Sequence, residues 1–412
     1  MSTTITKNKR MLVVSQHYWP ESFRINDICE GFVEYGFDVE VLCGIPNYPE
    51  GQFYDGYGFN VNRRQNVGGI KIRRCYEIKR GDNSNLRIFL NYISFPVSSL
   101  FSLPYLMRQK YDKIFMFQTS PVMMTLAGVL LGRLKKIETT MYVLDIWPEN
   151  LYSVLKIKSK LLRGMISRIS KWYYCKTDKL IANSQRLRSM LIERTGKSES
   201  GIIYIPQFCE KIYESAIIDE GLKACFPDTF NLVFAGNISP AQSFETVICA
   251  AKILKAKGYA DIAWIIVGDG MSKSWLEKEV QKEALSDCFK FIGRVPVQEI
   301  PRYTSIADGL FACLTKSEML DCTLPAKIFS YYAAGRPVLL AMDGEIKQIV
   351  KQSKAGYIVD SEDADGLADS VVKLYTASAA ERAAMGEAAR AYYFEHFERN
   401  MNMDKLIGFI EK

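Results

Sequence analysis

Residues 323–340, TLPAKIFSYYAAGRPVLL, decide the fold of this chain. Pro325 stands where a helix begins, a position that suits its fixed φ angle and its missing N–H. Lys327 then falls in the first turn, beside unpaired backbone amides and the positive end of the helix dipole. A lysine is disfavoured there unless an anion is bound. The helix ends at Gly335, and the residues from Pro337 onward have the pattern of a buried strand.

A helix mouth with an added lysine in an α/β unit has the outline of a phosphate site. The alternative is that Lys327 extends its ammonium group to solvent and that the segment is ordinary α/β core. The local sequence leaves both interpretations open.

The composition predicts a multidomain protein of a reducing compartment. A length of 412 residues suits two or three domains. Ten cysteines occur without a C-x-x-C pair, and His17 and His396 are the two histidines, so no zinc site is expected. Free cysteines, and an apolar run near the start that is too short for a signal peptide, predict a cytoplasmic location.

The charge is uneven along the chain. Residues 1–200 carry 30 Lys and Arg against 17 Asp and Glu, a net +13, whereas residues 201–412 carry 23 against 29, a net −6. The excess is concentrated in residues 151–200, with 12 basic and 3 acidic residues. A basic half favours an anionic partner, which leaves nucleic acid, anionic lipid and a phosphorylated substrate open.

Strand and helix patterns alternate along the chain and restart after Pro206. In the first half, strands are predicted at 11–15, 39–43, 70–74, 113–118, 140–144 and 179–182. In the second half, they are predicted at 231–235, 263–267, 290–292, 309–313 and 338–341. Helical patterns separate them, so the sequence predicts two doubly wound α/β domains with parallel sheets.

Two stretches favour contact with a membrane. Ile88–Met107 holds no charge across 20 residues, but Asn91 and Pro96 weaken a spanning helix. An interfacial segment is therefore favoured over a buried core helix, and a true span comes last. Lys156–Lys179 interleaves eight basic residues with apolar ones, which is typical of a helix lying on an anionic leaflet, although a solvated helix face is the alternative.

Short motifs occur from one end of the chain to the other: SQHYWPESFRIND (15–27), GIPNYPEG (44–51), LDIWPEN (144–150), IANS (181–184), VFAGN (233–237), VGDG (267–270), FIGRVP (291–296), PAKIFSYYAAGRPVL (325–339) and AYYFEHF (391–397). In this order they resemble the motifs of the GT-B glycosyltransferases of family 4. The resemblance is strongest to their WbuB-like branch, which acts in bacterial surface-polysaccharide assembly.

The resemblance implies two Rossmann-like domains facing a cleft. Residues 1–205 would form the acceptor- and membrane-facing domain, 206–385 the nucleotide-sugar domain, and 386–412 a helix returning to the first domain. The implied reaction is a retaining transfer, without a metal or other cofactor, of an N-acetylated deoxyhexosamine from a nucleotide diphosphate sugar, with UDP favoured. The implied acceptor is a polyprenyl-diphosphate-linked oligosaccharide. The protein would be peripheral on the inner face of the plasma membrane, with an anionic membrane surface and not nucleic acid as its partner.

The resemblance also implies donor-site residues in the second domain. Lys327, with the backbone of Thr323 and Leu324, would hold the diphosphate, and Ser330 would reach the ribose. The further donor candidates are Gly236, Asn237, Gly268 and Arg294. Gly268 has a plain βα turn as its alternative, and Arg294 would assist at the diphosphate or border the base.

In the first domain, the resemblance places His17, Glu21 and Arg24 where an acceptor or sugar would approach. His17 suits proton handling because the ordinary pKa of histidine lies near neutrality, but a structural histidine is the alternative. Asp145 would orient the acceptor hydroxyl, with a helix cap as its alternative, and Glu149 would face the same site.

The chain departs from the family pattern at several donor positions. Cys322 and Ser330 stand where many members carry two glutamates, and Asn237 and Gln242 where they carry arginine and lysine. Leu144 stands in place of a histidine. Two rival functions therefore stay open: a GT-B nucleotide-sugar epimerase and a non-catalytic membrane-associated scaffold.

Overall fold

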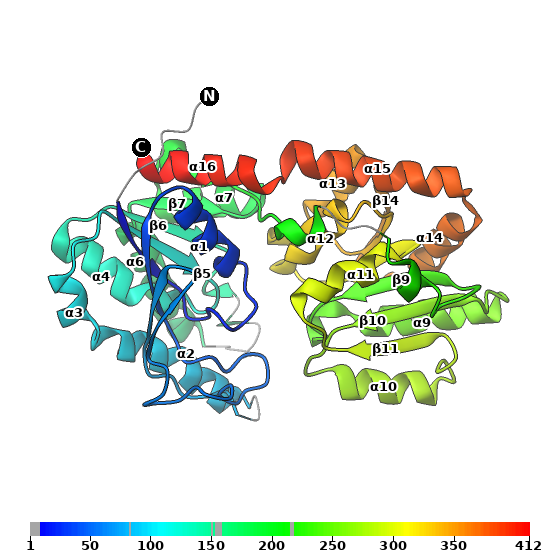
Figure 1. Cartoon of the computed structure of the whole chain (residues 1–412), viewed down its shortest axis with the longest axis horizontal. Helices are drawn as coiled ribbons and strands as arrows, with labels where there is room; N and C mark the ends of the chain where they lie inside the picture. Colours follow the sequence, from blue (N-terminus) through cyan, green and yellow to red (C-terminus); the bar gives the residue numbers. More distant parts are fainter. Residues whose placement is uncertain (1–8, 82–83, 150, 153–158, 215–217) are drawn as a thin grey trace. The chain divides into compact units, whose positions relative to one another are not determined.

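The computed structural model describes residues 9–81, 84–149, 151–152, 159–214 and 218–412 (Figure 1). They divide into two compact units. The first comprises the chain up to Pro206 together with Asn400–Lys412, and the second comprises Gln207–Arg399.

The first unit is built on an eight-stranded sheet of order β3-β4-β2-β1-β5-β6-β7-β8. All neighbouring strands are parallel except β3 and β4. The central strands are apolar and almost wholly buried, as expected of a sheet covered on both faces. Its strands are β1 (Arg10–Val14), β2 (Asp38–Cys43), β3 (Arg64–Val67), β4 (Ile70–Arg74), β5 (Lys113–Gln118), β6 (Thr139–Val143), β7 (Lys179–Ala182) and β8 (Ile202–Tyr204).

The helices of the first unit cover this sheet. They are α1 (Ile25–Glu34), α2 (Asn85–Leu100), α3 (Leu103–Arg108), α4 (Leu126–Lys135), α6 (Lys160–Lys176) and α7 (Gln185–Thr195), with the 3₁₀ turns η1 (Val122–Thr125) and η2 (Glu199–Gly201). Helix α7 begins directly after Ser184, because the hydroxyl of Ser184 accepts a hydrogen bond from the Leu187 amide at 3.0 Å.

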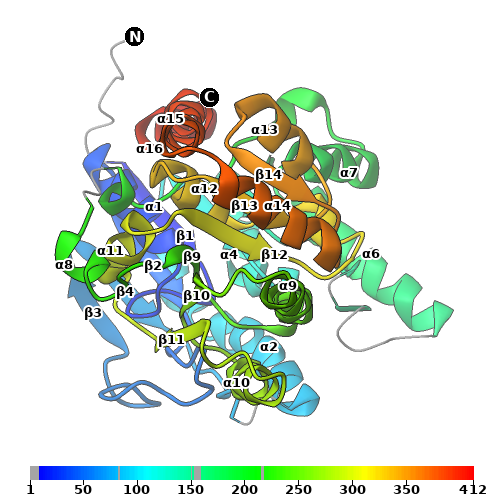
Figure 2. The ribbon, with the colours of Figure 1, turned by 90° about the vertical axis from the view of Figure 1, so that its right-hand side faces the viewer.

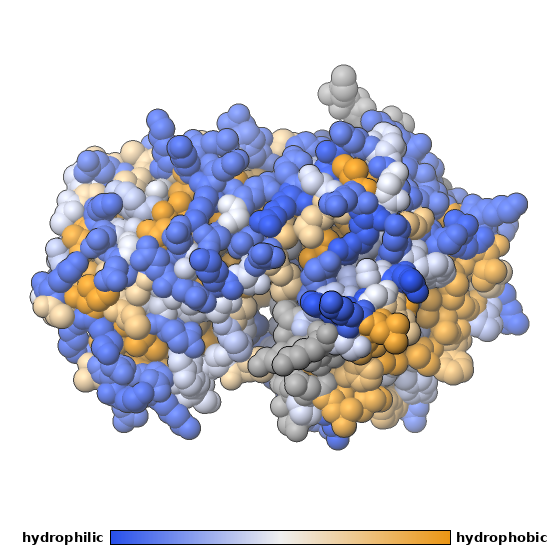
Figure 3. Space-filling model, turned by 180° about the vertical axis from the view of Figure 1, so that it is seen from behind, coloured by the Kyte–Doolittle hydropathy of each residue, from blue (hydrophilic) through white to orange (hydrophobic). Residues whose placement is uncertain are grey.

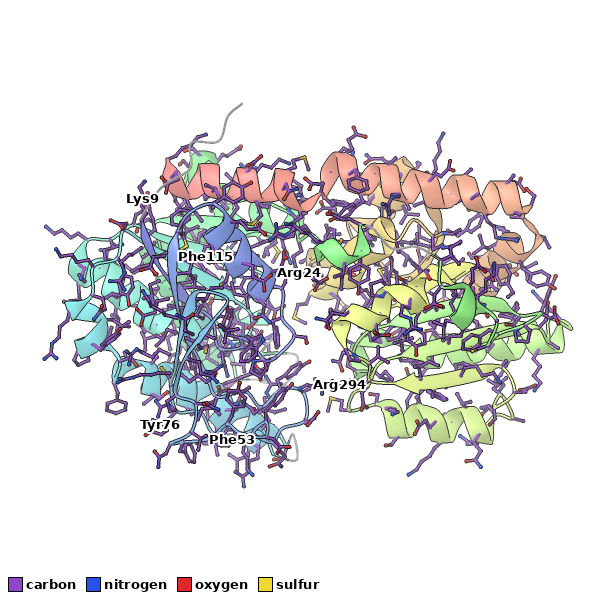
Figure 4. The ribbon with its side chains drawn as sticks, in the orientation of Figure 1. Lys9, Arg24, Phe53, Tyr76, Phe115 and Arg294 are labelled. Carbon is purple, nitrogen blue, oxygen red and sulfur yellow. The ribbon has the colours of Figure 1, made fainter. Side chains whose placement is uncertain are left out.

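The last helix of the chain, α16 (Arg399–Glu411), packs on the first unit. Tyr35 donates a hydrogen bond to Asp404 at 2.6 Å, and Lys9 pairs with Glu411 (Figure 4). The prediction that the C-terminal helix contacts the first domain is confirmed, and the returning segment begins at Asn400.

The second unit is built on a six-stranded, wholly parallel sheet of order β11-β10-β9-β12-β13-β14. Its strands are β9 (Phe230–Ala235), β10 (Ile262–Val267), β11 (Phe289–Gly293), β12 (Gly309–Cys313), β13 (Val338–Ala341) and β14 (Gly356–Val359). Its helices are α8 (Glu220–Lys223), α9 (Phe244–Ala256), α10 (Lys273–Lys282), α11 (Ile300–Ser305), α12 (Ala326–Ala333), α13 (Ile346–Ser353), α14 (Ala364–Thr376) and α15 (Ala379–His396), with 3₁₀ turns η3 (Lys211–Tyr213), η4 (Pro240–Gln242), η5 (Val297–Glu299) and η6 (Leu320–Cys322).

Both sheets reverse their strand order at one point, and this point positions the candidate sites. The reversal lies between β1 and β5 in the first unit and between β9 and β12 in the second. Open α/β sheets bind ligands beyond the carboxyl ends of the strands at such a point. The chain segments there begin with Ser15 after β1 and with Gly236 after β9, so both predicted doubly wound domains bring motif residues to these edges.

Candidate donor and acceptor sites

Lys327 is the second residue of α12, which follows Pro325 as its N-cap. Its ammonium nitrogen lies 3.8 Å from the centre of the Phe234 ring and donates a hydrogen bond to Gln242. No carboxylate of the described residues pairs with it. Burial lowers the pKa of Lys327 to about 7. A half-buried cation at a helix mouth, held by a neutral amide and an aromatic face, is suited to receive an anion.

The end of β9 is held against α12 by a buried tyrosine. The Ala235 amide donates to the hydroxyl of Tyr331 at 2.9 Å. A Cβ atom on the next residue, Gly236, would lie 3.2 Å from the ammonium nitrogen of Lys327, and its φ angle is +152°. A glycine at position 236 therefore leaves the room that the lysine occupies.

The loops after β9 and β10 pack backbone against backbone. The Gly236 amide donates to Val267 at 2.9 Å, and a Cβ atom on Gly268 would lie only 1.9 Å from the carbonyl oxygen of Gly236. Gly270 meets the Asn237 side chain and the Ile238 carbonyl in the same way. The structure thus brings Gly236, Asn237, Gly268 and Lys327 together. Loop packing accounts for the glycine at 268, and its contact with a donor stays a prediction.

The remaining donor candidates have different environments. Arg294 is exposed in the loop after β11 (Figure 4), and the carbonyl of the preceding Gly293 accepts from the Gly268 amide at 2.8 Å. Leu324 is a core residue, Thr323 is half-buried, and Ser330 is only 7% exposed. The predicted reach of Ser330 to a ribose stays a prediction.

Sequence reasoning proposed no contact for two residues of this cluster. Gln242, noted there only as a replacement of the usual lysine, accepts the hydrogen bond of Lys327. Lys273 opens α10, and its ammonium nitrogen lies 3.8 Å from where a Cβ of Gly293 would be. The signal for Lys273 was available, because a first-turn lysine is the same feature that marked Lys327.

In the first unit, His17 and Glu21 form a buried pair. The Nδ1 atom of His17 lies 2.9 Å from a Glu21 carboxylate oxygen, and the other oxygen accepts from the backbone amides of Asn47 and Tyr48 at 2.8 and 2.7 Å. The imidazole stacks on Phe23 with ring centres 4.8 Å apart. The motif after β1 is therefore bound to the loop after β2, and Glu21 fixes the orientation of the imidazole.

The other candidates of the first unit lie after β6 or at the start of α1. Asp145 accepts a hydrogen bond from Ser120 at 3.1 Å. Glu149 pairs with Arg194, and Arg194 also donates a hydrogen bond to the Trp147 carbonyl. The carboxylate of Glu149 is therefore occupied within the unit. Arg24 is the half-buried N-cap residue of α1. Catalytic and acceptor roles for these residues stay predictions.

Neither unit brings metal ligands together within the part of the chain that the structure describes. No group of three or more His, Cys, Asp and Glu side chains there is arranged to hold an ion.

Known proteins share both the sequence pattern and this fold. Residues 224–392 match the family described as "Glycosyl transferases group 1". This match places the second unit among the group 1 glycosyltransferases, family 4 with the GT-B fold. It runs from β9 into α15 and includes every donor candidate named above.

Two curated relatives extend the similarity to glycosyltransferases over most of the chain. The putative colanic acid biosynthesis glycosyl transferase WcaI of Escherichia coli is 25% identical over 341 residues, 79% of this chain and 81% of that protein. The probable glycosyltransferase WbjE of Pseudomonas aeruginosa is 22% identical over 347 residues, 81% and 83% respectively. Among solved structures, Anabaena Alr3699/HepE, in complex with UDP and glucose, has a TM-score of 0.70 at 15% identity and covers 97% of this glycosyltransferase and 98% of its own chain.

Proposed function

We propose that this glycosyltransferase moves a sugar from a nucleotide diphosphate sugar to a polyprenyl-diphosphate-linked oligosaccharide during surface-polysaccharide synthesis. The sugar is an N-acetylated deoxyhexosamine, UDP is the nucleotide, and the anomeric configuration is retained. The named relatives support a role in polysaccharide synthesis, since WcaI is described as a putative glycosyl transferase of colanic acid biosynthesis. The UDP and glucose bound to HepE support the donor class.

Lys327 carries this proposal. Departure of a nucleoside diphosphate places negative charge on the leaving phosphate oxygen, and a cation fixed in advance stabilises that charge. Lys327 is such a cation, because Gln242 and Phe234 hold it without neutralising it. The amides in the first turn of α12 add donors beside it.

The bond changes follow from this arrangement. The bond from the anomeric carbon to the phosphate oxygen breaks, and the acceptor oxygen bonds to the same face of that carbon. The acceptor proton passes to the departing phosphate oxygen. In this scheme, Asp145 orients the acceptor hydroxyl, and His17, held by Glu21, hydrogen-bonds to the acceptor while its proton moves to the phosphate oxygen.

Donor specificity gives the direct test. At 100 times its dissociation constant, UDP stabilises the folded protein by about 2.7 kcal/mol. We therefore expect a thermal shift of about 5 °C or more with UDP and smaller shifts with GDP and dTDP. Transfer should then require both a UDP-sugar and a polyprenyl-diphosphate-linked acceptor.

The rival functions predict other results of the same assay. Conversion of the UDP-sugar to its epimer in the absence of an acceptor would favour the epimerase function over the transferase function. Absence of stabilisation by all three nucleotides would favour the scaffold.

A membrane surface is the proposed location of the acceptor. Leu86–Arg108, which spans α2 and α3, is the one helix within the described residues with the length and composition to cross a membrane, and 28% of its most apolar window is buried. Its polar groups point inward: Ser98 and Asn91 donate to the backbone of the 76–78 segment. Apolar side chains remain outside, with Phe101 81% exposed. This favours an interfacial helix over a span.

Helix α6 continues this apolar surface. Both α2 and α6 contact η1 and α4. Figure 3 shows hydrophobic residues gathered on the right-hand part of the view, and Figure 2 shows α6 projecting from its neighbours. Exposed apolar residues recur along α6 at one helical face: Leu161, Leu162, Met165, Ile169 and Trp172. Exposed basic residues accompany them, as on a helix that lies on an anionic leaflet.

The predicted basic stretch is only partly available for such contact. Lys156 and Lys158 lie outside the described residues, and Lys179 instead pairs with Glu138 at 2.8 Å. Lys160, Arg163, Arg168 and Lys171 are exposed. Each basic residue near an anionic leaflet contributes about 1 kcal/mol, so these four dominate the expected attraction.

Replacing Lys160, Arg163, Arg168 and Lys171 together by glutamine should release the protein from vesicles of anionic lipid in flotation assays. The expected loss is roughly 1,000-fold in partitioning, because about 4 kcal/mol of attraction disappears. A matched control changes Lys252, Lys255, Lys257 and Lys278, four exposed lysines of the second unit, and should float like the wild type. Equal release of both variants, or of neither, would refute the role of α6.

A further inference from the structure

Glu77 is a buried carboxyl group that no step of the proposed reaction uses. It follows β4 and is 1% exposed. One of its oxygens, Oε1, accepts from the side-chain amides of Gln16 at 2.7 Å and Asn91 at 2.6 Å. Gln16 directly precedes His17, and Asn91 is a fully buried residue of α2. Glu77 thus joins the segment that carries His17 to the proposed membrane helix.

The second oxygen of Glu77 occupies space that a glycine leaves open. A Cβ atom on Gly44 would lie 1.7 Å from this oxygen, Oε2, and 2.9 Å from the backbone carbonyl oxygen of Gln16. Neither Oε2 nor the side-chain oxygen of Gln16 has a hydrogen-bond partner among the described residues. A buried carboxylate with an unpaired oxygen is costly in this place, whereas a neutral carboxyl group carries no charge to desolvate.

A second set of bonds leads from Asn91 to the same histidine. The Asn91 side chain donates to Asn47 at 3.4 Å, and the Asn47 amide donates to Glu21, which binds His17. Two hydrogen-bond paths therefore lead to His17, one through Glu77 and Gln16 and the other through Asn47 and Glu21. Asn91 takes part in both paths.

We propose that Glu77 is a positioning residue of the transfer reaction: in its neutral form it fixes Gln16 and the adjoining loop, and so holds His17 in place for the acceptor. The proposal rests on the role of His17 in the proposed function. A neutral acid is required because a buried Glu77 carboxylate would repel the Glu21 carboxylate. This repulsion would drive apart the two sets of hydrogen bonds that hold His17.

The surroundings of Glu77 give this requirement a pH range. Burial raises the pKa of Glu77 to about 7, and the nearby Glu21 acts in the same direction. His17 and Arg80 oppose this rise in the pKa, as does the hydrogen bond from Gln16. Two thiols, Cys43 and Cys75, also face the group. Turnover should therefore fall as the pH rises through about 7, where Glu77 becomes ionised.

The test compares Glu77→Gln, Glu77→Ala and a control, Tyr111→Phe. Gln keeps the shape and cannot ionise, so its turnover should match the wild type at pH 6 and exceed it at pH 8. Ala should lower kcat roughly tenfold or more with donor affinity unchanged, because His17 loses its support. Tyr111→Phe removes one buried hydrogen bond of 2.7 Å, to Glu40 in the same unit, and should keep the wild-type pH profile. An unchanged profile in Glu77→Gln, or full turnover in Glu77→Ala, would overturn the proposal.

A measurement without turnover separates this proposal from the proposed function. The chain has two histidines, so selective ring labelling resolves His17 and His396 by NMR. In the wild type, the pH dependence of the His17 resonances should include a contribution from the ionisation of Glu77. Glu77→Gln should change this pH dependence and leave that of the His396 resonances unchanged. An identical pH dependence of the His17 resonances in both proteins would exclude coupling of the two groups, whether or not the protein transfers a sugar.

Discussion

Replacing Lys327 by alanine should lower turnover at least ~100-fold, the scale of losing one main donor to a developing oxyanion. The lysine is the one cation that the structure holds beside both Gly236 and the first turn of α12 within the described residues. Because the stabilised charge appears on the leaving group, kcat should fall more than donor affinity. Steady-state kinetics with a UDP-sugar and a lipid-linked acceptor give both values.

Lys347→Ala is a closely matched control. Lys347 is also the second residue of an eight-residue helix of the same unit, α13. Lys347 differs from Lys327 because it is paired with Asp343 and Asp360, which already neutralise its charge. We expect its turnover to stay within about twofold of the wild type, as is usual for exposed ion pairs.

Stability distinguishes a lost site from a damaged fold. Lys327 is a half-buried charge without a carboxylate partner in the described residues, so Lys327→Met should unfold at the same temperature as the wild type or higher. A variant that is inactive and equally stable supports the assignment. Full activity of Lys327→Ala would remove Lys327 from the mechanism.

The sequence predicts the interior of each sheet better than its edges. The predicted strands match β1, β2, β5 and β6 to within one residue at each end. The missed strands are β3, β8 and β14, and each forms an edge of its sheet. Central parallel strands are continuous apolar runs, whereas the edge strand β3 reads RQNV and carries no such signal.

The residues of the candidate sites also differ in how well the sequence predicts them. Lys327 and Gly236 were predictable because helix mouths and strand ends leave local signals. Glu77 was not predictable, since its partners Gln16, Gly44 and Asn91 come from three other segments of the chain. Asn91 even weakened the expectation for its own helix, although its amide proves to be a buried anchor. A hydrogen-bond network that closes only in the folded unit gives no periodic pattern to recognise.

Donor binding should depend on pH because Lys327 changes its charge in the relevant range. Burial lowers the pKa of Lys327 to about 7 in the empty site, so above this pH the amine is mostly neutral. A bound diphosphate favours the ammonium form and returns the pKa toward its ordinary value of about 10.4. Binding therefore takes up a proton between these two values, and affinity falls by up to tenfold per pH unit.

Calorimetry with a UDP-sugar measures this uptake, because its diphosphate diester has no proton to lose in this range. Between pH 7 and 9 we expect the dissociation constant to rise up to ~100-fold, with close to one proton bound per donor when buffers of different ionisation enthalpy are compared. Below about pH 6 the lysine is charged before and after binding, so the uptake should vanish. Lys327→Met should bind more weakly, with no proton uptake at any pH, while Lys347→Ala should follow the wild type. Donor affinity that stays constant from pH 6 to 9 would mean that the diphosphate does not contact Lys327.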